Sequence, residues 1–118
     1  MPMMEPSDFS GAVPVDGYGP GFFRVRGLLY RGPVLVTERG ASDWGGLTDV
    51  RPLLDLAGRV DVLFLGMGAD IAPPPRDLIA ALEAAGIMPE AMNTASAARS
   101  YNVTLSEGRR VACALLPL

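Results

Sequence analysis

One strand–helix–strand segment constrains the fold more strongly than any other part of the sequence. Arg59–Leu65 is an almost continuous apolar run, which is typical of a central strand covered on both faces. A helix is predicted from Pro75 to Ala85, with Gly86 where a helix-ending glycine belongs. Ile87–Met92 then returns as a strand. Two strands joined by a helix within about thirty residues predict a parallel βαβ unit with a right-handed crossover.

Short strands are predicted on the N-terminal side of this unit. The glycines of Gly17–Gly21 predict a turn-rich loop that opens onto a strand at Phe22–Arg26. Leu28–Tyr30 and Val34–Thr37 follow as strands, so this part of the chain is predicted to be a β-meander. Glu38–Leu47 is predicted to be a glycine-rich loop whose single tryptophan covers the core.

Two further helices are indicated by capping residues. Thr48 or Asp49 is expected to cap a short helix that ends near Ala57. Thr94 is expected to cap an alanine-rich helix from Ala95 to about Asn102, whose small residues allow close packing on a sheet. With these helices, the chain is predicted to have an α/β fold.

The last strand is predicted at Arg109–Leu116, and a chain of 118 residues fits one domain. Residues 1–14 contain prolines and little periodicity, which indicates a flexible lead-in, and residues 15–118 are assigned to the domain. Hydrophobic residues make up 49% of the chain, which excludes disorder and favours a protein partner, with a homodimer as one option.

The composition excludes several classes of chemistry. The chain contains neither His nor Lys, so it has no Ser-His-Asp triad, imidazole metal ligand, Schiff-base lysine or P-loop lysine. Its net charge of −3 argues against nucleic acid as a partner. The single cysteine, Cys113, lies in an apolar run and is expected to be buried and unreactive. No metal site and no cofactor are predicted.

The apolar segments are strand-sized, and none is long enough to insert into a membrane. Met1–Ser10 has acids and prolines where a signal peptide needs positive charge and then an apolar run. A cytoplasmic protein is therefore expected.

Two glycine clusters invite a dinucleotide-binding interpretation, but neither completes the motif. The pair Gly66 and Gly68 follows the central strand, yet Ile71 occupies the position of the third glycine. In the cluster that contains Gly17 and Gly19, that position is taken by Phe22. The Gly66–Gly68 cluster is interpreted as a tight strand exit that needs positive φ or a close approach of the backbone, and the Gly17–Gly21 cluster as a turn that leads into a strand.

Polar residues gather in the C-terminal third of the chain. Spacing allows Glu90 to pair with Arg99 across a strand and a helix, and Glu107 with Arg109 at the last turn. Three interpretations stay open: a buried Arg–carboxylate network that holds the helix to the sheet, a pocket for a small anion, or catalysis by carboxylates. The complete candidate set is Gly66, Gly68, Glu90, Met92, Thr94, Arg99, Tyr101, Asn102, Glu107 and Arg109.

The same residues carry a resemblance to a known family. The blocks Glu90-x-Met92-x-Thr94, Ala97-Ala98-Arg99-x-Tyr101-Asn102-Val103 and Glu107-Gly108-Arg109-x-Val111 resemble the signature of a family of uncharacterised small domains. That family includes a mitochondrial assembly factor of respiratory complex I (the third of the numbered factors) and an adipogenesis-associated protein. The glycine clusters and the Phe22-Phe23 strand match in the same order, from about Val15 to Leu116.

The resemblance implies a single three-layer domain with a curved, half-barrel mixed sheet and two to three helices. It implies no enzyme activity, no cofactor and no catalytic residues, and the chain is identified as a bacterial member because it lacks an Arg- and Ser-rich transit segment. The expected function is that of a non-enzymatic protein-interaction domain that works as an assembly or accessory factor. The alternative is a protein that binds a small anion near Arg99, Glu90 and the Gly66–Gly68 loop.

Overall fold

The computed structural model describes residues 9–70 and 72–118. In chain order, the elements are β1 (Gly17–Gly19), β2 (Phe22–Val25), β3 (Leu28–Arg31), β4 (Val34–Thr37), β5 (Gly40–Asp43), α1 (Arg51–Leu54), β6 (Val62–Gly66), α2 (Arg76–Ala84), β7 (Met88–Met92), α3 (Thr94–Ser106) and β8 (Val111–Leu115).

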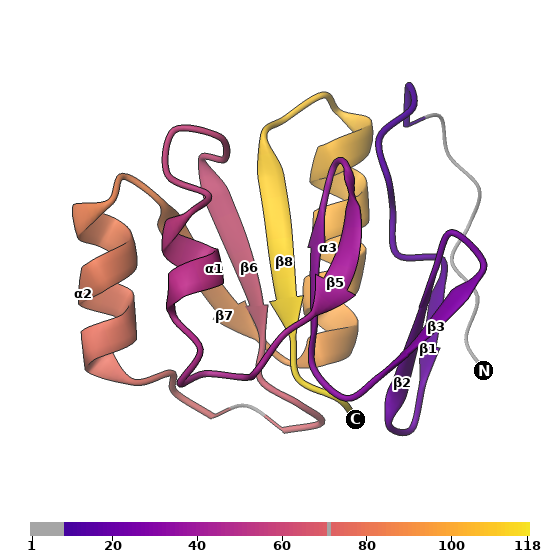
Figure 1. The fold of residues 1–118 in the computed structure, drawn as a ribbon, viewed down its shortest axis with the longest axis horizontal. Helices are drawn as coiled ribbons and strands as arrows, with labels where there is room; N and C mark the ends of the chain where they lie inside the picture. Colours follow the sequence, from indigo (N-terminus) through magenta and orange to yellow (C-terminus); the bar gives the residue numbers. More distant parts are fainter. Residues whose placement is uncertain (1–8, 71) are drawn as a thin grey trace.

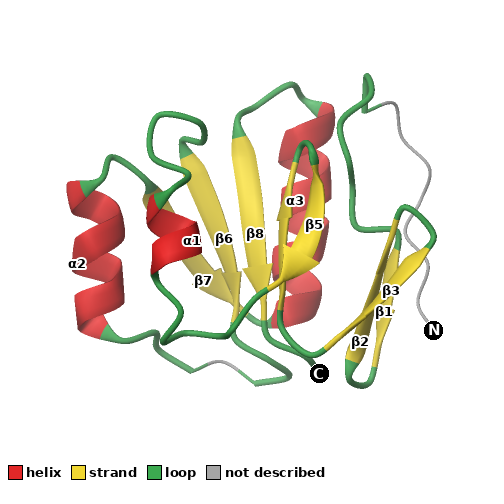
Figure 2. Cartoon of the chain, viewed as in Figure 1, coloured by secondary structure: helices red, strands yellow, loops and turns green. Residues whose placement is uncertain are grey.

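The strands form two sheets (Figure 2). The larger sheet has the order β5-β4-β8-β6-β7, in which β6 runs parallel to β7 and β8, while β4 runs antiparallel to β5 and β8. The smaller sheet is the antiparallel meander β1-β2-β3. The predicted βαβ unit is confirmed as β6–α2–β7.

The larger sheet lies between two layers (Figure 1). Alternate residues of its strands point to opposite faces, so Val62 and Phe64 enter one apolar core with α3 and the small sheet, whereas Leu63 and Leu65 enter a second core with α1 and α2. This arrangement confirms the predicted single three-layer α/β fold with a mixed sheet. Cys113 is fully buried in the first core, as expected.

The prediction for Gly17–Gly19 was wrong, because these residues form strand β1 rather than a turn. Glycine has a low intrinsic preference for strands, so the sequence gives no signal for one here. The strand exists because Gly19 pairs with Phe22 across a tight turn. A side chain at Gly19 would lie 2.6 Å from the Phe22 ring, so glycine at this position lets the ring lie over the backbone.

Two further predictions between the meander and the central strand need correction. The predicted loop at Glu38–Leu47 contains strand β5, which pairs with β4. Trp44 follows directly after β5 and is buried in the second core as expected. The helix predicted to end near Ala57 is the single turn α1, followed by turns up to Arg59.

Helix α3 differs from its prediction at both ends. Its cap is Asn93, whose side-chain oxygen accepts a hydrogen bond of 2.8 Å from the backbone N–H of Ser96. Thr94 is the first helical residue rather than the cap, and the helix continues to Ser106 instead of ending near Asn102. The extra turn carries Leu105, which is buried in the first core, so packing supports the helix beyond its predicted end.

Candidate functional site

Thr94 joins three segments at one end of the sheet. Its hydroxyl donates a hydrogen bond of 2.6 Å to the carbonyl of Leu116 and accepts one of 2.9 Å from the N–H of Gly68. Its own N–H donates to the carbonyl of Gly68 at 2.9 Å. The side chain is completely buried. Thr94 therefore fixes the start of α3 to the ends of β6 and β8.

The two candidate glycines lie at this junction. A Cβ on Gly66 would lie 2.8 Å from a methyl carbon of Leu115 and 2.9 Å from the Thr94 hydroxyl oxygen. Gly68 has a backbone φ of +94°, which other residues rarely adopt. Both glycines therefore have a structural role, and the interpretation of this cluster as a tight strand exit agrees with the geometry.

Tyr101 and Asn102 hold the segment that precedes β1. The Tyr101 hydroxyl donates to the carbonyl of Val13 at 2.7 Å. The Asn102 side chain accepts from the N–H of Val15 and donates to the carbonyl of Val15, both at 2.9 Å. Residues 9–14 of the predicted lead-in are described, residues 1–8 lie outside the described part, and Val13 is buried in the first core.

Burial also decides the protonation of Tyr101 and Cys113 inside the first core. It raises the pKa of the Tyr101 phenol far above its ordinary value of 10.0, so the hydroxyl stays protonated and donates its hydrogen bond to the Val13 carbonyl. It raises the pKa of the Cys113 thiol well above 9.0. Neither group supplies a nucleophile at neutral pH.

Glu90 and Arg99 are not brought together. Glu90 is exposed on β7, which is the edge strand of the larger sheet. Arg99 is also exposed, and its guanidinium donates to the Tyr18 hydroxyl on β1 at 3.3 Å. Met92 lies between them in sequence, and its sulfur accepts from the Ser100 hydroxyl at 3.6 Å. The described residues form no buried Arg–carboxylate network, so that interpretation was wrong.

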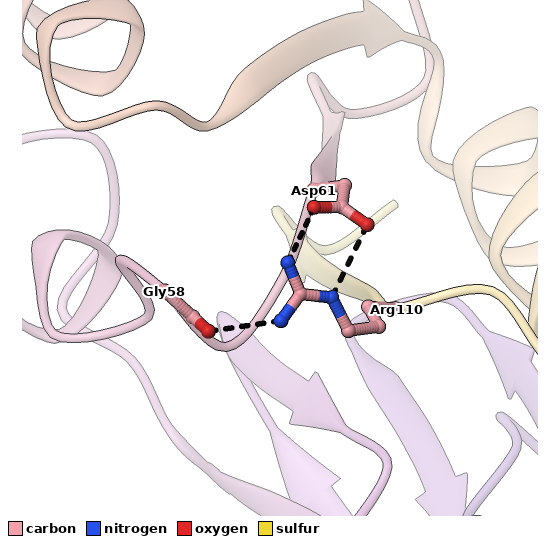
Figure 3. A network of polar contacts seen from close by, with 3 residues as sticks. All are labelled: Gly58, Asp61 and Arg110. Atoms are coloured by element: carbon pink, nitrogen blue, oxygen red, sulfur yellow. Dashed lines mark hydrogen bonds and ion pairs between the residues drawn. The ribbon is translucent and has the colours of Figure 1, made fainter.

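Glu107 and Arg109 are exposed and do not form an ion pair with each other in the described part of the chain. The neighbouring Arg110 does form one. Figure 3 shows its guanidinium holding both carboxylate oxygens of Asp61, at 2.6 and 3.2 Å, and the carbonyl of Gly58 at 2.9 Å. This bidentate contact is exposed, and it lowers the pKa of Asp61 chiefly through the hydrogen bond. The sequence predicted an ion pair for Arg109, whereas the next residue, Arg110, forms one.

Three residues in these contacts, Tyr18, Asp61 and Arg110, were not in the predicted site. Tyr18 was assigned to a loop, although it faces Arg99 from a strand. Asp61 and Arg110 stand directly before two parallel strands whose first residues, Val62 and Val111, are paired. Asp61 and Arg110 therefore precede paired residues of neighbouring strands. If the pairing of β6 with β8 had been known, it would have indicated the contact between these two side chains.

The polar residues described above have a structural role. Within residues 9–70 and 72–118, no three His, Cys, Asp or Glu side chains are grouped so that they could hold a metal ion. No described helix combines the length and the apolar character that crossing a membrane requires. The buried polar groups of α3 are used to hold other parts of the chain.

Comparison with known proteins gives consistent matches. The profile of a family described as "Protein of unknown function (DUF498/DUF598)" matches residues 15–116. An uncharacterised protein of Rhodobacter capsulatus is 58% identical over 110 residues, which are 93% of this chain and 89% of that protein.

Two more distant proteins extend the comparison. A Drosophila melanogaster protein named NADH dehydrogenase [ubiquinone] 1 alpha subcomplex assembly factor 3 is 32% identical over 87% of this chain, and the match spans only 58% of the fly protein. The solution structure of a Bordetella pertussis protein described as a Mth938-like domain is 25% identical and superposes with a TM-score of 0.76, covering 99% of this chain and 92% of that one.

Proposed function

This chain belongs to the DUF498/DUF598 family of proteins of unknown function, and from that membership we propose that it is a non-enzymatic protein-interaction domain that works as an assembly or accessory factor in the cytoplasm. The expectation of this family from the sequence is thereby confirmed, including its distant relation to an assembly factor.

One structural observation carries the proposal. The polar residues that most resemble a site, Thr94, Tyr101 and Asn102, are buried and hydrogen-bonded to backbone groups of other segments. Side chains used in this way hold the fold together and are not presented to a substrate. The groups left exposed, such as Glu90 and Arg99, lie on separate elements and suit contacts with a protein surface.

The relation to the fly protein supports the assembly role. That protein is named as an assembly factor, and its match covers 87% of this chain. The rest of the fly protein has no counterpart here, because the match covers 58% of its length. The proposed role therefore concerns the shared domain, and the partner is a protein or an assembly of proteins.

The test is affinity capture of the tagged full chain from the cell in which it naturally occurs. Membranes are solubilised mildly, bound proteins are identified by mass spectrometry, and the tag alone is the control. Reproducible recovery of subunits of a respiratory complex, or of another defined assembly, is the expected result. A chain that purifies without any specific partner contradicts the proposal, as does one that turns over a metabolite.

A further inference from the structure

We propose that the free edge of strand β3 is a docking site for an extended acidic segment of a partner protein, which pairs with β3 as an additional strand. This inference rests on the proposed role in protein interaction and names the surface and the chemistry of the partner.

Strand β3 has an unpaired side. It is the last strand of the order β1-β2-β3, and among the described residues it pairs with β2 alone. Arg26 and Gly27 both have positive φ, at 53° and 76°, which is the geometry of a two-residue hairpin turn. In such a hairpin the hydrogen-bonded pairs alternate, so the N–H and C=O groups of Leu29 and Arg31 point away from β2. These groups can bind another strand.

Two side chains on this strand, Leu28 and Leu29, are apolar and exposed. The exposed fractions are 61% for Leu28 and 42% for Leu29, which place both among the five large hydrophobic residues most exposed in the described chain. The register pairs Leu28 with the buried Val25 and Leu29 with Arg24, so the two leucines lie on opposite faces of the sheet. A strand added at this edge would cover both, because its own side chains alternate between the same two faces.

The charge of the small sheet selects an acidic partner. The chain has a net charge of −3, yet residues 17–37 contain three arginines and no Asp or Glu. None of these arginines, Arg24, Arg26 and Arg31, forms an ion pair within the described residues. Arg31 is on β3 itself and Arg26 is at the hairpin tip, so carboxylates of an added strand would meet both of them.

Two other occupants fit less well. A second copy of this chain paired through β3 would bring two sets of three arginines together without a carboxylate between them, and like charges at close range oppose association. A lipid surface needs apolar side chains gathered on one face, whereas Leu28 and Leu29 are on opposite faces and the tip between the strands carries Arg26.

The experiment uses the full chain labelled with ¹⁵N and two synthetic peptides of the same length, one alternating Glu and Val and the other alternating Lys and Val. The acidic peptide is expected to shift the amide signals of β3 and to slow hydrogen exchange at Leu29 and Arg31, with binding that weakens as salt is raised. The double variant R26E/R31E should lose about tenfold in affinity, and R59E, an exposed charge reversal outside the small sheet, should lose little.

A second variant separates backbone pairing from charge attraction. Leu29→Pro removes the outward N–H without breaking a bond to β2, and it should abolish the slowed exchange while the hairpin stays folded. Shifts that spread over all arginine-rich surfaces, or equal binding of both peptides, overturn the inference.

Affinity capture with the same variants distinguishes this inference from the proposed function. If the wild-type chain captures an assembly and R26E/R31E and Leu29→Pro retain it, the interaction role stands and the β3 site is wrong. If R59E captures the assembly and the β3 variants do not, the site is supported. A dimer that these β3 variants abolish would assign the edge to a second copy and overturn the acidic partner.

Discussion

The side-chain amide of Asn102 binds both backbone polar groups of Val15, which lies 87 residues earlier in the chain. The amide oxygen accepts from the Val15 N–H, and the amide nitrogen donates to the Val15 carbonyl. Asn102 thus makes the two backbone hydrogen bonds that a neighbouring strand would make to this segment, which lies just before β1. This contact fastens the N-terminal part of the domain to α3.

Replacing Asn102 should therefore release that segment. Asn102→Ala leaves the buried N–H and C=O of Val15 without this partner, which should lower the free energy of unfolding by about 1–3 kcal/mol. Urea denaturation measures the loss, and hydrogen exchange at the Val15 amide should become faster. The control is Val103→Ala on the same helix, where the side chain is 57% exposed and little change is expected. Equal effects of the two variants would contradict this role.

Thr94 should be replaceable by serine but not by valine. Thr94→Val keeps the shape and removes the hydroxyl, so the buried N–H of Gly68 loses its acceptor and stability should fall by about 1–3 kcal/mol. Thr94→Ser keeps both hydrogen bonds and should cost less. Thr104→Val is the matched control, because within the described part of the chain the Thr104 hydroxyl bonds only to carbonyls of its own helix. Thermal unfolding of the three variants gives the comparison, and a Thr94→Val protein as stable as Thr104→Val would refute it.

Gly66 and Gly68 should resist substitution for different reasons. A Cβ at Gly66 would lie 3.0 Å from the Thr94 Cα and closer still to Leu115, so Gly66→Ala should cost about 1–3 kcal/mol through overpacking. At Gly68 the nearest atom to a Cβ is 3.8 Å away, and the cost, also about 1–3 kcal/mol, arises from the positive φ.

A double-mutant cycle with Leu115→Ala distinguishes the two glycines. Removing the Leu115 side chain takes away one of the close contacts at Gly66, so Gly66→Ala should be less harmful in that background. Gly68→Ala should cost the same in both backgrounds. Additive behaviour of Gly66→Ala would show that the contact with Leu115 is not the cause.

Alkaline pH should destabilise the protein through two buried acids, Cys113 and Tyr101. The folded state raises the pKa of Cys113 well above 9.0 and that of Tyr101 above 10.0, mainly because burial disfavours their charged forms. Below these ordinary pKa values, the folded and the unfolded chain both keep the protons, so the two groups do not lower the free energy of unfolding. Above them the unfolded chain releases its protons first, so stability falls, by about 1.4 kcal/mol per pH unit for each group.

Two variants assign this pH dependence. Urea unfolding at a series of pH values should show the decline beginning near pH 9 and becoming steeper near pH 10. Cys113→Ala should remove the first part and Tyr101→Phe the second, although each also lowers stability at neutral pH. An unchanged slope in both variants would rule out these groups as the source.

The exposed Asp61–Arg110 contact makes a prediction at the acidic end. In the folded protein the pKa of Asp61 should lie below its ordinary value of 3.8, chiefly because Arg110 donates hydrogen bonds to the carboxylate. The stability from this contact is therefore present above that value and is lost as the pH falls through the lowered pKa. An NMR titration should show the pKa rising in Arg110→Met and changing much less in Arg109→Met, which acts on Asp61 through charge alone. The same shift in both variants would contradict the assignment to the hydrogen bond.

The central part of the fold follows from the local pattern of the sequence. The apolar run before Gly66 and the amphipathic helix after it leave little choice but a βαβ unit, because a strand buried on both faces needs neighbours and helices to cover it. The burial of Trp44 and Cys113 followed from their types and surroundings. In these segments the apolar side chains that form the sequence pattern are the ones that become buried, so the prediction holds.

Strand β1 and the partners of the polar residues depend on tertiary contacts. Gly17–Gly19 becomes a strand only because β2 lies beside it, and no intrinsic preference of glycine announces that pairing. Likewise, the sequence shows that Thr94, Tyr101 and Asn102 are polar, but their partners are backbone groups of Gly68, Val13 and Val15. Every residue carries such groups, so only the folded chain selects which of them a distant side chain meets.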